Sequence, residues 1–161
     1  MKIFTYGSPV LKSISSDVTV FDADISNFMK DLALAMKKAN GAGLAAPQVG
    51  KSVRAFVIID DAGSLYKVVN PKVVGSKGRI SLQEGCLSLP GLFFPVERAK
   101  EIDVEYQDDA GRIVNQKFSG LASRAYLHEL DHLDGKLLTD FMSQDQLRWY
   151  LTRNMTAASG L

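Results

Sequence analysis

The segment HELDH at residues 128–132 constrains this chain more than any other part of its sequence. It lies in a stretch, Gly120 to Leu133, that favours a helix, and Gly135 follows as a stop signal. Four residues advance a helix by about 400°, so the two imidazoles project from nearly one face, one turn apart. Two ligands of one metal ion need this geometry, and the carboxylate of Glu129 beside them can accept a proton from water at that metal. The segment therefore predicts a metal-binding helix with hydrolytic chemistry.

Composition limits what can complete the metal site, because the chain holds two His and one Cys. A metzincin protease would place a third His at position 138, where this sequence has Leu138. A thermolysin-like protease would use a later Glu, but every acidic residue after Leu133 is an Asp. Cys86 is therefore the best third ligand, and a set of two imidazoles and one thiolate leaves a fourth position open, as in catalytic sites. The candidate metal ligands are Cys86, His128 and His132.

Cys86 lies in a segment that we expect to be extended. There Glu84, Cys86 and Ser88 would share one face, because side chains alternate along a strand. Gly85 carries no side chain and would let a substrate backbone approach closely.

The remaining pattern predicts one α+β domain over residues 1–161, with a mixed, mainly antiparallel sheet around the metal-binding helix. Apolar spacing predicts a helix over 22–39, and the run Ser-Gln-Asp-Gln predicts a short C-terminal helix over 143–155. Strands are expected at 54–60, 66–69, 72–74, 102–106 and 112–118, with a hairpin turn between the last two. The Gly-Ala-Gly run at 41–43 is expected to open a loop.

Charge and cysteine content exclude several classes of protein. Nineteen Lys and Arg against 18 Asp and Glu leave a net charge of +1, which gives no strong attraction to nucleic acid or an anionic membrane. Apolar runs such as 55–59 are too short to span a bilayer, and residues 1–10 do not resemble an export signal. A single Cys excludes an internal disulfide framework. We therefore expect a cytoplasmic protein with no membrane and no direct nucleic-acid partner.

Three segments together resemble the peptide deformylase family: GAGLAAPQ at 41–48, EGCLS at 84–88 and HELDH at 128–132. Their order and spacing are also similar to that family, over about residues 6–142. The resemblance implies removal of the N-formyl group from N-formylmethionyl nascent peptides, with release of formate. It also implies one divalent metal ion per chain, natively Fe²⁺, although Zn²⁺, Ni²⁺ or Co²⁺ can occupy such a site.

The resemblance also implies roles for individual residues. Cys86, His128 and His132 would hold the metal, and Glu129 would be the acid and base. The side-chain amide of Gln48 and the backbone N–H of Leu87 would donate to the developing oxyanion.

Other residues would, by the same resemblance, bind and support the substrate. The peptide backbone would pair in extended form with the loop at Gly43 and with the segment after Leu87. Leu121 and Ala125, one to two turns before the first His, would form walls of the methionine pocket. The supporting ion pair would join Glu84 and Arg98.

The sequence departs from the family pattern in several places. Residues 92–94 read Leu-Phe-Phe where many bacterial members carry an Arg, which predicts a more apolar cleft rim. Leu127 replaces the Gln that usually precedes the first His, and Arg124 stands where some members have an apolar residue. The tail after Ser143 carries only two basic residues, so any ribosome contact would be transient. The protein is expected to be a monomer.

Two other hypotheses use the same helix. A small zinc endopeptidase with an HExxH motif is disfavoured by the missing third His or Glu and by the small size of the chain. A metal-binding domain without enzymatic activity would have no reason to keep Glu129 or Gln48.

Overall fold

The computed structural model describes residues 1–158, with side chains up to residue 154. Its helices are α1 (Ala23–Lys38), α2 (Gly120–Leu133) and α3 (Gln144–Ala158). Its strands are β1 (Gly43–Ala45), β2 (Ala55–Ile59), β3 (Leu65–Lys77), β4 (Ile80–Cys86), β5 (Leu89–Arg98), β6 (Glu101–Gln107) and β7 (Ile113–Ser119). The expected single domain over 1–161 includes residues 159–161, which lie outside the described residues.

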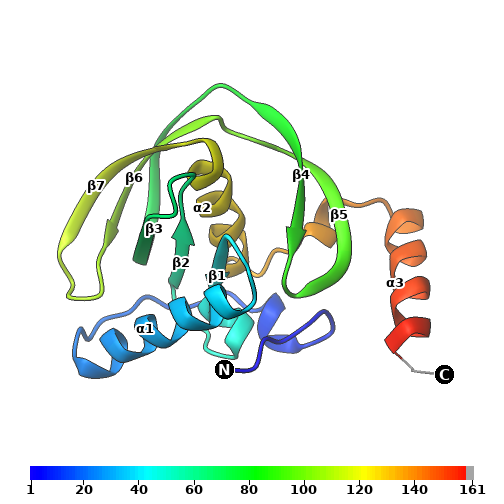
Figure 1. The fold of residues 1–161 in the computed structure, drawn as a ribbon, viewed down its shortest axis with the longest axis horizontal. Helices are drawn as coiled ribbons and strands as arrows, with labels where there is room; N and C mark the ends of the chain where they lie inside the picture. Colours follow the sequence, from blue (N-terminus) through cyan, green and yellow to red (C-terminus); the bar gives the residue numbers. More distant parts are fainter. Residues whose placement is uncertain (159–161) are drawn as a thin grey trace.

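The strands form two antiparallel sheets, as Figure 1 shows. Five strands pair in the order β1-β2-β3-β6-β7, so that β1 lies at one edge, while β4 and β5 form a separate hairpin. Within the described residues, the one parallel pairing is an isolated bridge between Ser16 and Val53. The predicted α+β class with a mainly antiparallel sheet is confirmed.

The two faces of the large sheet are covered by different helices (Figure 1). Phe56 and Ile58 of β2 belong to the hydrophobic cluster that includes Tyr126 of α2. The alternate residues Ala55 and Val57 belong to the cluster with α1. This alternation follows from the two-residue period of a strand. The β4–β5 hairpin lies on the other side of α2 (Figure 1). Helix α2 is therefore placed between the large sheet and this hairpin, which confirms a central helix.

Both ends of α2 are fixed by contacts with distant parts of the chain. At its start, Asp61 from the turn after β2 accepts a hydrogen bond from the backbone N–H of Leu121, at 3.3 Å. At its end, Gly135 has a φ of +73°, and a Cβ there would lie 2.6 Å from the carbonyl oxygen of Lys12. Only Gly fits such a position at little cost. The predicted bounds of this helix, Gly120 to Leu133, are confirmed.

The prediction of two short strands at 66–69 and 72–74 is wrong, because β3 runs as one strand from Leu65 to Lys77. The Asn70-Pro71 pair lies instead at an irregularity in the pairing between β3 and β6. Asn70 adopts a φ of +51°, and its side chain bonds to both backbone groups of Val18. A bulge lets a strand tolerate a proline that cannot donate a hydrogen bond.

Two further segments differ from the prediction. The loop expected from 41–43 is only partly a loop, because Gly43 begins edge strand β1 and pairs with Ile58. The extended segment around Cys86 belongs to a complete hairpin, β4–β5, that was not predicted. The strand ends at Cys86, so Ser88 lies in the turn of this hairpin and not on the strand face shared by Glu84 and Cys86.

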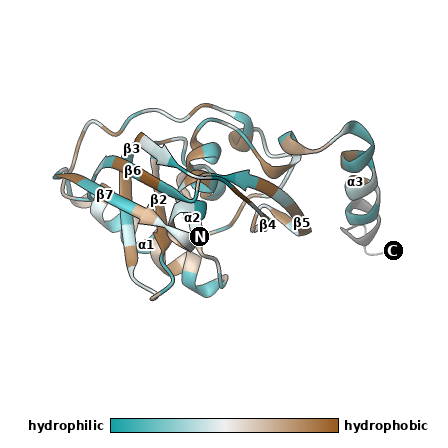
Figure 2. Cartoon of the chain, turned by 90° about the horizontal axis from the view of Figure 1, so that it is seen from above, coloured by the Kyte–Doolittle hydropathy of each residue, from teal (hydrophilic) through white to brown (hydrophobic). Residues whose placement is uncertain are grey.

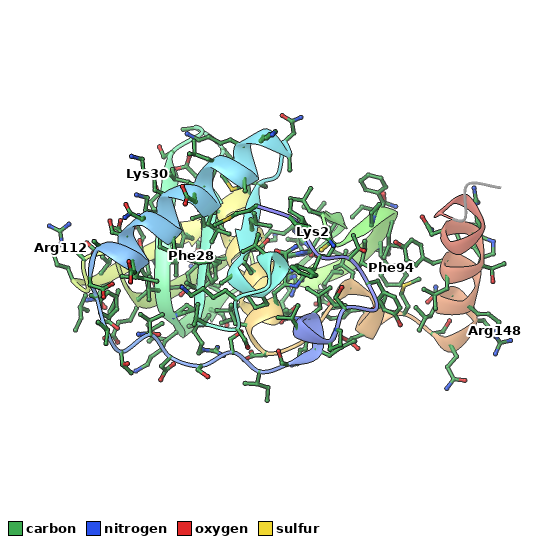
Figure 3. The ribbon with its side chains drawn as sticks, turned by 90° about the horizontal axis from the view of Figure 1, so that it is seen from below. Lys2, Phe28, Lys30, Phe94, Arg112 and Arg148 are labelled. Atoms are coloured by element: carbon green, nitrogen blue, oxygen red, sulfur yellow. The ribbon has the colours of Figure 1, made fainter. Side chains whose placement is uncertain are left out.

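Helix α3 lies at one end of the molecule, beside the hairpin, as Figure 2 shows. The predicted capping motif is confirmed, since Ser143 and Gln146 exchange side-chain to backbone hydrogen bonds of 2.8 and 3.1 Å. Buried Tyr150 donates a hydrogen bond to the carbonyl of Pro90, at 3.0 Å, and packs in a cluster with Phe94. Figure 3 shows Phe94 on the side of the hairpin near α3 and Arg148 pointing outward. Within residues 1–158, no helix is long and apolar enough to cross a membrane.

Candidate metal centre and active site

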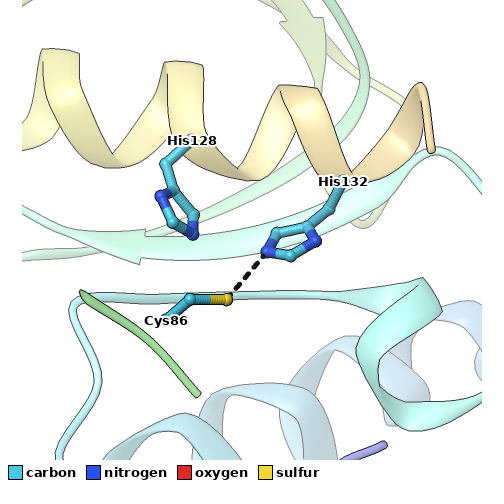
Figure 4. A group of neighbouring side chains, drawn as sticks. All are labelled: Cys86, His128 and His132. Carbon is cyan, nitrogen blue, oxygen red and sulfur yellow. Dashed lines mark hydrogen bonds between the residues drawn. The ribbon is translucent and has the colours of Figure 1, made fainter. Parts of the chain in front are cut away.

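Cys86 at the end of β4 faces His128 and His132 of α2, as Figure 4 shows. One ligand atom from each of the three residues lies within 4.8 Å of the other two. The sulfur of Cys86 is 3.4 Å from Nε2 of His132, and the two imidazole centroids are 5.1 Å apart. Three soft or borderline donors converging on one point fit a single transition-metal cation and leave a coordination position for water.

The two histidines are held differently. Nδ1 of His128 contacts a carboxylate oxygen of Glu84 at 2.8 Å, which leaves Nε2 for the centre. Burial works against a charged ring, but hydrogen bonds with Cys86 and Glu84 outweigh it and raise the pKa of His128 to about 10. A cation must therefore compete with a proton at this ring. Burial lowers the pKa of His132 well below its usual range, so this ring is neutral and able to bind a metal.

Glu84 is the centre of a buried charged network. Its carboxylate accepts two hydrogen bonds of 2.9 Å from Arg98 and a further one from Arg124. Burial raises the pKa of Glu84, but the hydrogen bonds from Arg98 and His128 outweigh it and lower the pKa to about 2. Arg98 also donates to Asp131 at 2.6 Å. The ion pair implied between Glu84 and Arg98 is thus present, and it fixes the charged group that orients His128.

We expect Glu84→Gln to destabilise the protein and weaken metal binding, because it removes the charge that two buried arginines share. The free energy of unfolding should fall by about 3–5 kcal/mol, as when one partner of a buried ion pair is removed. Metal affinity should fall about 10- to 100-fold, as for other residues that orient a ligand. Urea unfolding of the metal-free protein and a metal titration measure the two effects.

The matched control is Glu97→Gln on the same hairpin. Glu97 pairs with Arg79, but both side chains are more than half exposed. Exposed ion pairs contribute at most about 1 kcal/mol. Equal effects of the two substitutions would contradict a special role for Glu84.

Glu129 is buried beside the ligands, with 4% of its surface exposed. Burial is the main reason that its pKa is raised, to about 7, with His128 acting in the opposite direction. Its Oε2 atom has no hydrogen-bond partner among the described residues. Gly43 makes room for it, since a Cβ there would lie only 2.8 Å from Oε1. A carboxyl group with a free oxygen and a pKa near neutrality is suited to accept and return a proton.

Gln48 reaches the centre from the 3₁₀ turn Ala46–Val49 that follows β1. Its Oε1 accepts the backbone N–H of Ala45 at 2.9 Å, which fixes the orientation of the amide. Its Nε2 donates to Oγ of Ser88 at 3.1 Å and lies 3.8 Å from the sulfur of Cys86. Ser88 in turn donates to the carbonyl of Phe4 at 2.6 Å. The amide nitrogen of Gln48 is therefore directed to the thiolate side of the centre.

A cavity of about 540 Å³ opens in front of these groups, between α2, the β1 segment and the hairpin. The predicted site residues that line it are Gly43, Gln48, Glu84, Gly85, Cys86, Leu87, Leu121, Ala125, His128 and Glu129. Arg98 and His132 lie behind this surface and are not among its lining residues. Of the apolar residues at 92–94, Leu92 is buried and Phe93 is 69% exposed, so Phe93 forms the rim of the cavity.

Three residues near the centre were not given a role from the sequence. They are Ser88, which holds Gln48, Asp131, which binds Arg98, and Arg124, which binds Glu84. The position of Asp131 inside HELDH was a usable signal, but its partner is 33 residues away in the chain. Only the fold brings these residues together.

The chain matches a family model described as Polypeptide deformylase over residues 1–148. Among curated proteins, it is 39% identical to a peptide deformylase of Dictyoglomus turgidum, over 87% of this chain and 91% of that protein. It is 38% identical to a peptide deformylase of Thermotoga maritima, over 88% of this chain and 87% of that protein.

Solved structures show the same similarity in three dimensions. The peptide deformylase of Thermus thermophilus is 39% identical, with a TM-score of 0.86, over 96% of this chain and 92% of that one. The peptide deformylase of Ehrlichia chaffeensis, solved in complex with actinonin, is 30% identical, with a TM-score of 0.93, over 98% and 96% of the two chains. This chain belongs to the polypeptide deformylase family.

Proposed function

We propose that Cys86, His128, His132, Glu129, Gln48 and Leu87 act together to hydrolyse the N-formyl group of N-formylmethionyl peptides. The chain is a hydrolase of the deformylase family, which removes this group from nascent peptides. The observation that carries the assignment of residues is the buried, unpartnered carboxylate oxygen of Glu129 beside the three converging ligands. An endopeptidase that uses the same motif is not favoured by the similarity to deformylases.

Cys86, His128 and His132 would hold one divalent cation. Bound there, the cation would act as a Lewis acid on the formyl oxygen and make water more acidic. We infer Fe²⁺ as the native ion. Zn²⁺, Ni²⁺ or Co²⁺ are possible occupants as well, since ligands of this softness accept all four ions.

Glu129 would move the proton that hydrolysis requires. Its carboxylate takes a proton from the attacking water as the new carbon–oxygen bond forms at the formyl carbon. The same carboxyl group then gives this proton to the α-nitrogen of methionine as the carbon–nitrogen bond breaks. The products are a free α-amine and formic acid, which gives its proton to the solvent to become formate, and Glu129 returns to its starting state.

Gln48 and Leu87 would stabilise the oxygen on which negative charge develops. The amide of Gln48 has two N–H donors, of which Ser88 uses one. The second is directed to the side of Cys86, where a formyl oxygen near the ligands would lie. The backbone N–H of Leu87, next to Cys86 in the hairpin turn, would be the second donor.

Gln48→Ala should lower kcat for deformylation about 10²- to 10³-fold, as loss of one oxyanion donor does in other hydrolases. KM should change little, because the interaction forms mainly in the transition state. Steady-state formate release measures both constants. Ser64→Ala, in the exposed turn before β3, is a suitable control. A variant of Gln48 with wild-type kcat would contradict the role of the amide.

The peptide would lie extended between β1 and the hairpin turn. Strand β1 is the edge of the large sheet, and residues 41–43 line the cavity, so the side of this strand that does not pair with β2 would be open to a peptide. Gly85 on the other wall leaves space for the peptide backbone. Leu121 and Ala125 offer apolar surface for the methionine side chain.

The three candidate ligands, Glu129 and Gln48 are all supplied by one chain, so the proposed site would be complete in a monomer. A reducing compartment would keep Cys86 as a free thiolate for the metal, which is consistent with a cytoplasmic location. Transient contact with the ribosome would use the exposed surface of α3, where Arg148 and Trp149 face solvent.

One comparison of substrates tests the proposed function. Formyl-Met-Ala-Ser should release formate, while an unformylated peptide of similar sequence should stay intact at its internal bonds. Cleavage of internal bonds without formate release would instead support an endopeptidase.

A further inference from the structure

Arg124 lies in α2, one turn before His128, and its side chain is only 12% exposed. Its guanidinium group lies within hydrogen-bond distance of four acceptors on the β4–β5 hairpin, three of which share the two N–H groups of Nη1. They are the carbonyls of Ile80 (2.8 Å), Val96 (2.9 Å) and Leu82 (3.5 Å) and the carboxylate of Glu84. One side chain therefore connects the central helix to both strands of the hairpin.

The hairpin is also attached to α2 by the contact between Glu84 and His128 and by the bond from Arg98 to Asp131. Among these side chains, Arg124 is the one that binds backbone carbonyls of both strands. The side chains of Ile80 and Leu82 are 39% and 50% exposed, so the first half of β4 is not held by apolar burial. Leu82 and Val96 are direct partners in the hairpin, which means that Arg124 binds the two strands at one register position. One further bond, from Ser123 to the carbonyl of Ala99, joins α2 to the segment after β5.

The same residue also forms part of the cavity. Arg124 lines it together with Leu121 and Ala125 from α2 and with Gln83 and Glu84 from β4. Because the guanidinium group is bound to the hairpin, the aliphatic part of the side chain crosses from one wall of the cavity to the other. The separation of the two walls at this end of the cavity therefore depends in part on this side chain.

We propose that Arg124 is a positioning residue that sets the width of the pocket for the first side chain of the substrate. The inference rests on the proposed function, since it concerns which formylated peptides the cleft accepts. A guanidinium group suits this role because its rigid, planar set of five donors can bind several carbonyls at once. A lysine has one ammonium group and cannot reach all four acceptors in the same arrangement.

The test compares Arg124→Met and Arg124→Lys with Arg79→Met. Methionine keeps an unbranched stem and removes every donor, while Arg79 is an exposed residue just before β4 that pairs with Glu97. Steady-state kinetics use formyl-Met-Ala-Ser and the bulkier formyl-Phe-Ala-Ser. Hydrogen exchange reports on the backbone amides of residues 80–83.

We expect Arg124→Met to raise KM for the methionine peptide about fivefold to tenfold. The preference for methionine over phenylalanine should fall by a similar factor, because the shape of the pocket sets such selectivity. The kcat for the methionine peptide should stay within about threefold, since Glu129 and the ligands are untouched and Arg98 still holds Glu84 through two hydrogen bonds. Hydrogen exchange at 80–83 should accelerate at least about tenfold, because local opening becomes easier. Arg124→Lys should lie between wild type and Arg124→Met, and Arg79→Met should match wild type.

An Arg124→Met protein with wild-type KM and selectivity would overturn the inference, even if its Tm were lower, because the residue would then only stabilise the fold. If Arg124→Met does not fold, Arg124→Lys decides the matter by the same criteria. Failure of the wild-type chain to release formate would refute the proposed function instead, and hydrogen exchange at 80–83 would still test the attachment of the hairpin.

Discussion

Glu129→Ala is expected to lower the rate of formate release about 10³-fold while leaving one metal ion per chain. Proton transfer by a positioned side chain contributes about 10²- to 10⁴-fold to catalysis. Glu129 is buried, and its Oε2 has no partner among the described residues. Among the residues that α2 contributes to the cavity lining, it is the one acid. Single-turnover formate release and metal analysis of the same sample measure the two quantities.

Glu129→Gln is the matched control for shape, because it keeps the size of the side chain beside Gly43 and removes its ability to carry the proton. It should be as inactive as Glu129→Ala. Arg79→Met, on the exposed side of the hairpin, controls for general effects of substitution. Either Glu129 variant with wild-type activity would contradict the assigned mechanism.

Cys86→Ala is expected to lose the metal and, with it, deformylation. The two remaining imidazoles cannot hold the ion alone, because His132 and His128 would supply only two of the ligands that catalytic sites of this kind use. Bound metal should fall below about a tenth of the wild-type content after dialysis, since metal affinity depends on every deprotonated ligand. Metal analysis and a thermal unfolding curve should be recorded together.

The fold itself should survive this substitution. Cys86 is half-buried, and its cluster is built mainly from larger residues such as Leu89, Leu92 and Tyr150. Ser81→Ala, on the exposed part of β4, is the control and should bind metal as wild type does. Stoichiometric metal in Cys86→Ala would show that another residue completes the ligand set.

Much of the fold was predictable because local patterns carry it. Helix α2 has a run of residues that favours a helix and a glycine stop, and α1 begins after Asp22, whose side chain accepts two backbone N–H groups. The hairpin between β6 and β7 follows from its turn residues. The errors arose where tertiary contacts override a local signal, as at Asn70, whose side chain bonds to Val18 in the segment before α1, 52 residues away in the chain.

The β4–β5 hairpin was missed for a physical reason. Most of β4 is exposed, and its buried position is the charged Glu84, so the strand has no apolar alternation to detect. The burial of Glu84 becomes favourable only when Arg98 and Arg124 reach it from other elements.

The candidate site was predictable to the extent that its residues lie within short motifs. HELDH places two ligands and Glu129 by helix geometry alone, and the scarcity of Cys and His leaves Cys86 as the third. The support around these residues was not predictable in the same way. Ser88 orients Gln48 from 40 residues away, and Arg124 binds carbonyl groups, which every residue of the chain possesses.

A titration of the metal-free chain with Fe²⁺ in the absence of oxygen tests the central claim most directly, with bound metal and formate release measured in each sample. If Cys86, His128 and His132 form one catalytic metal site, both quantities should rise together and reach their limits at one ion per chain. Full activity in the metal-free chain, or activity that rises only after a second ion binds, would contradict this account.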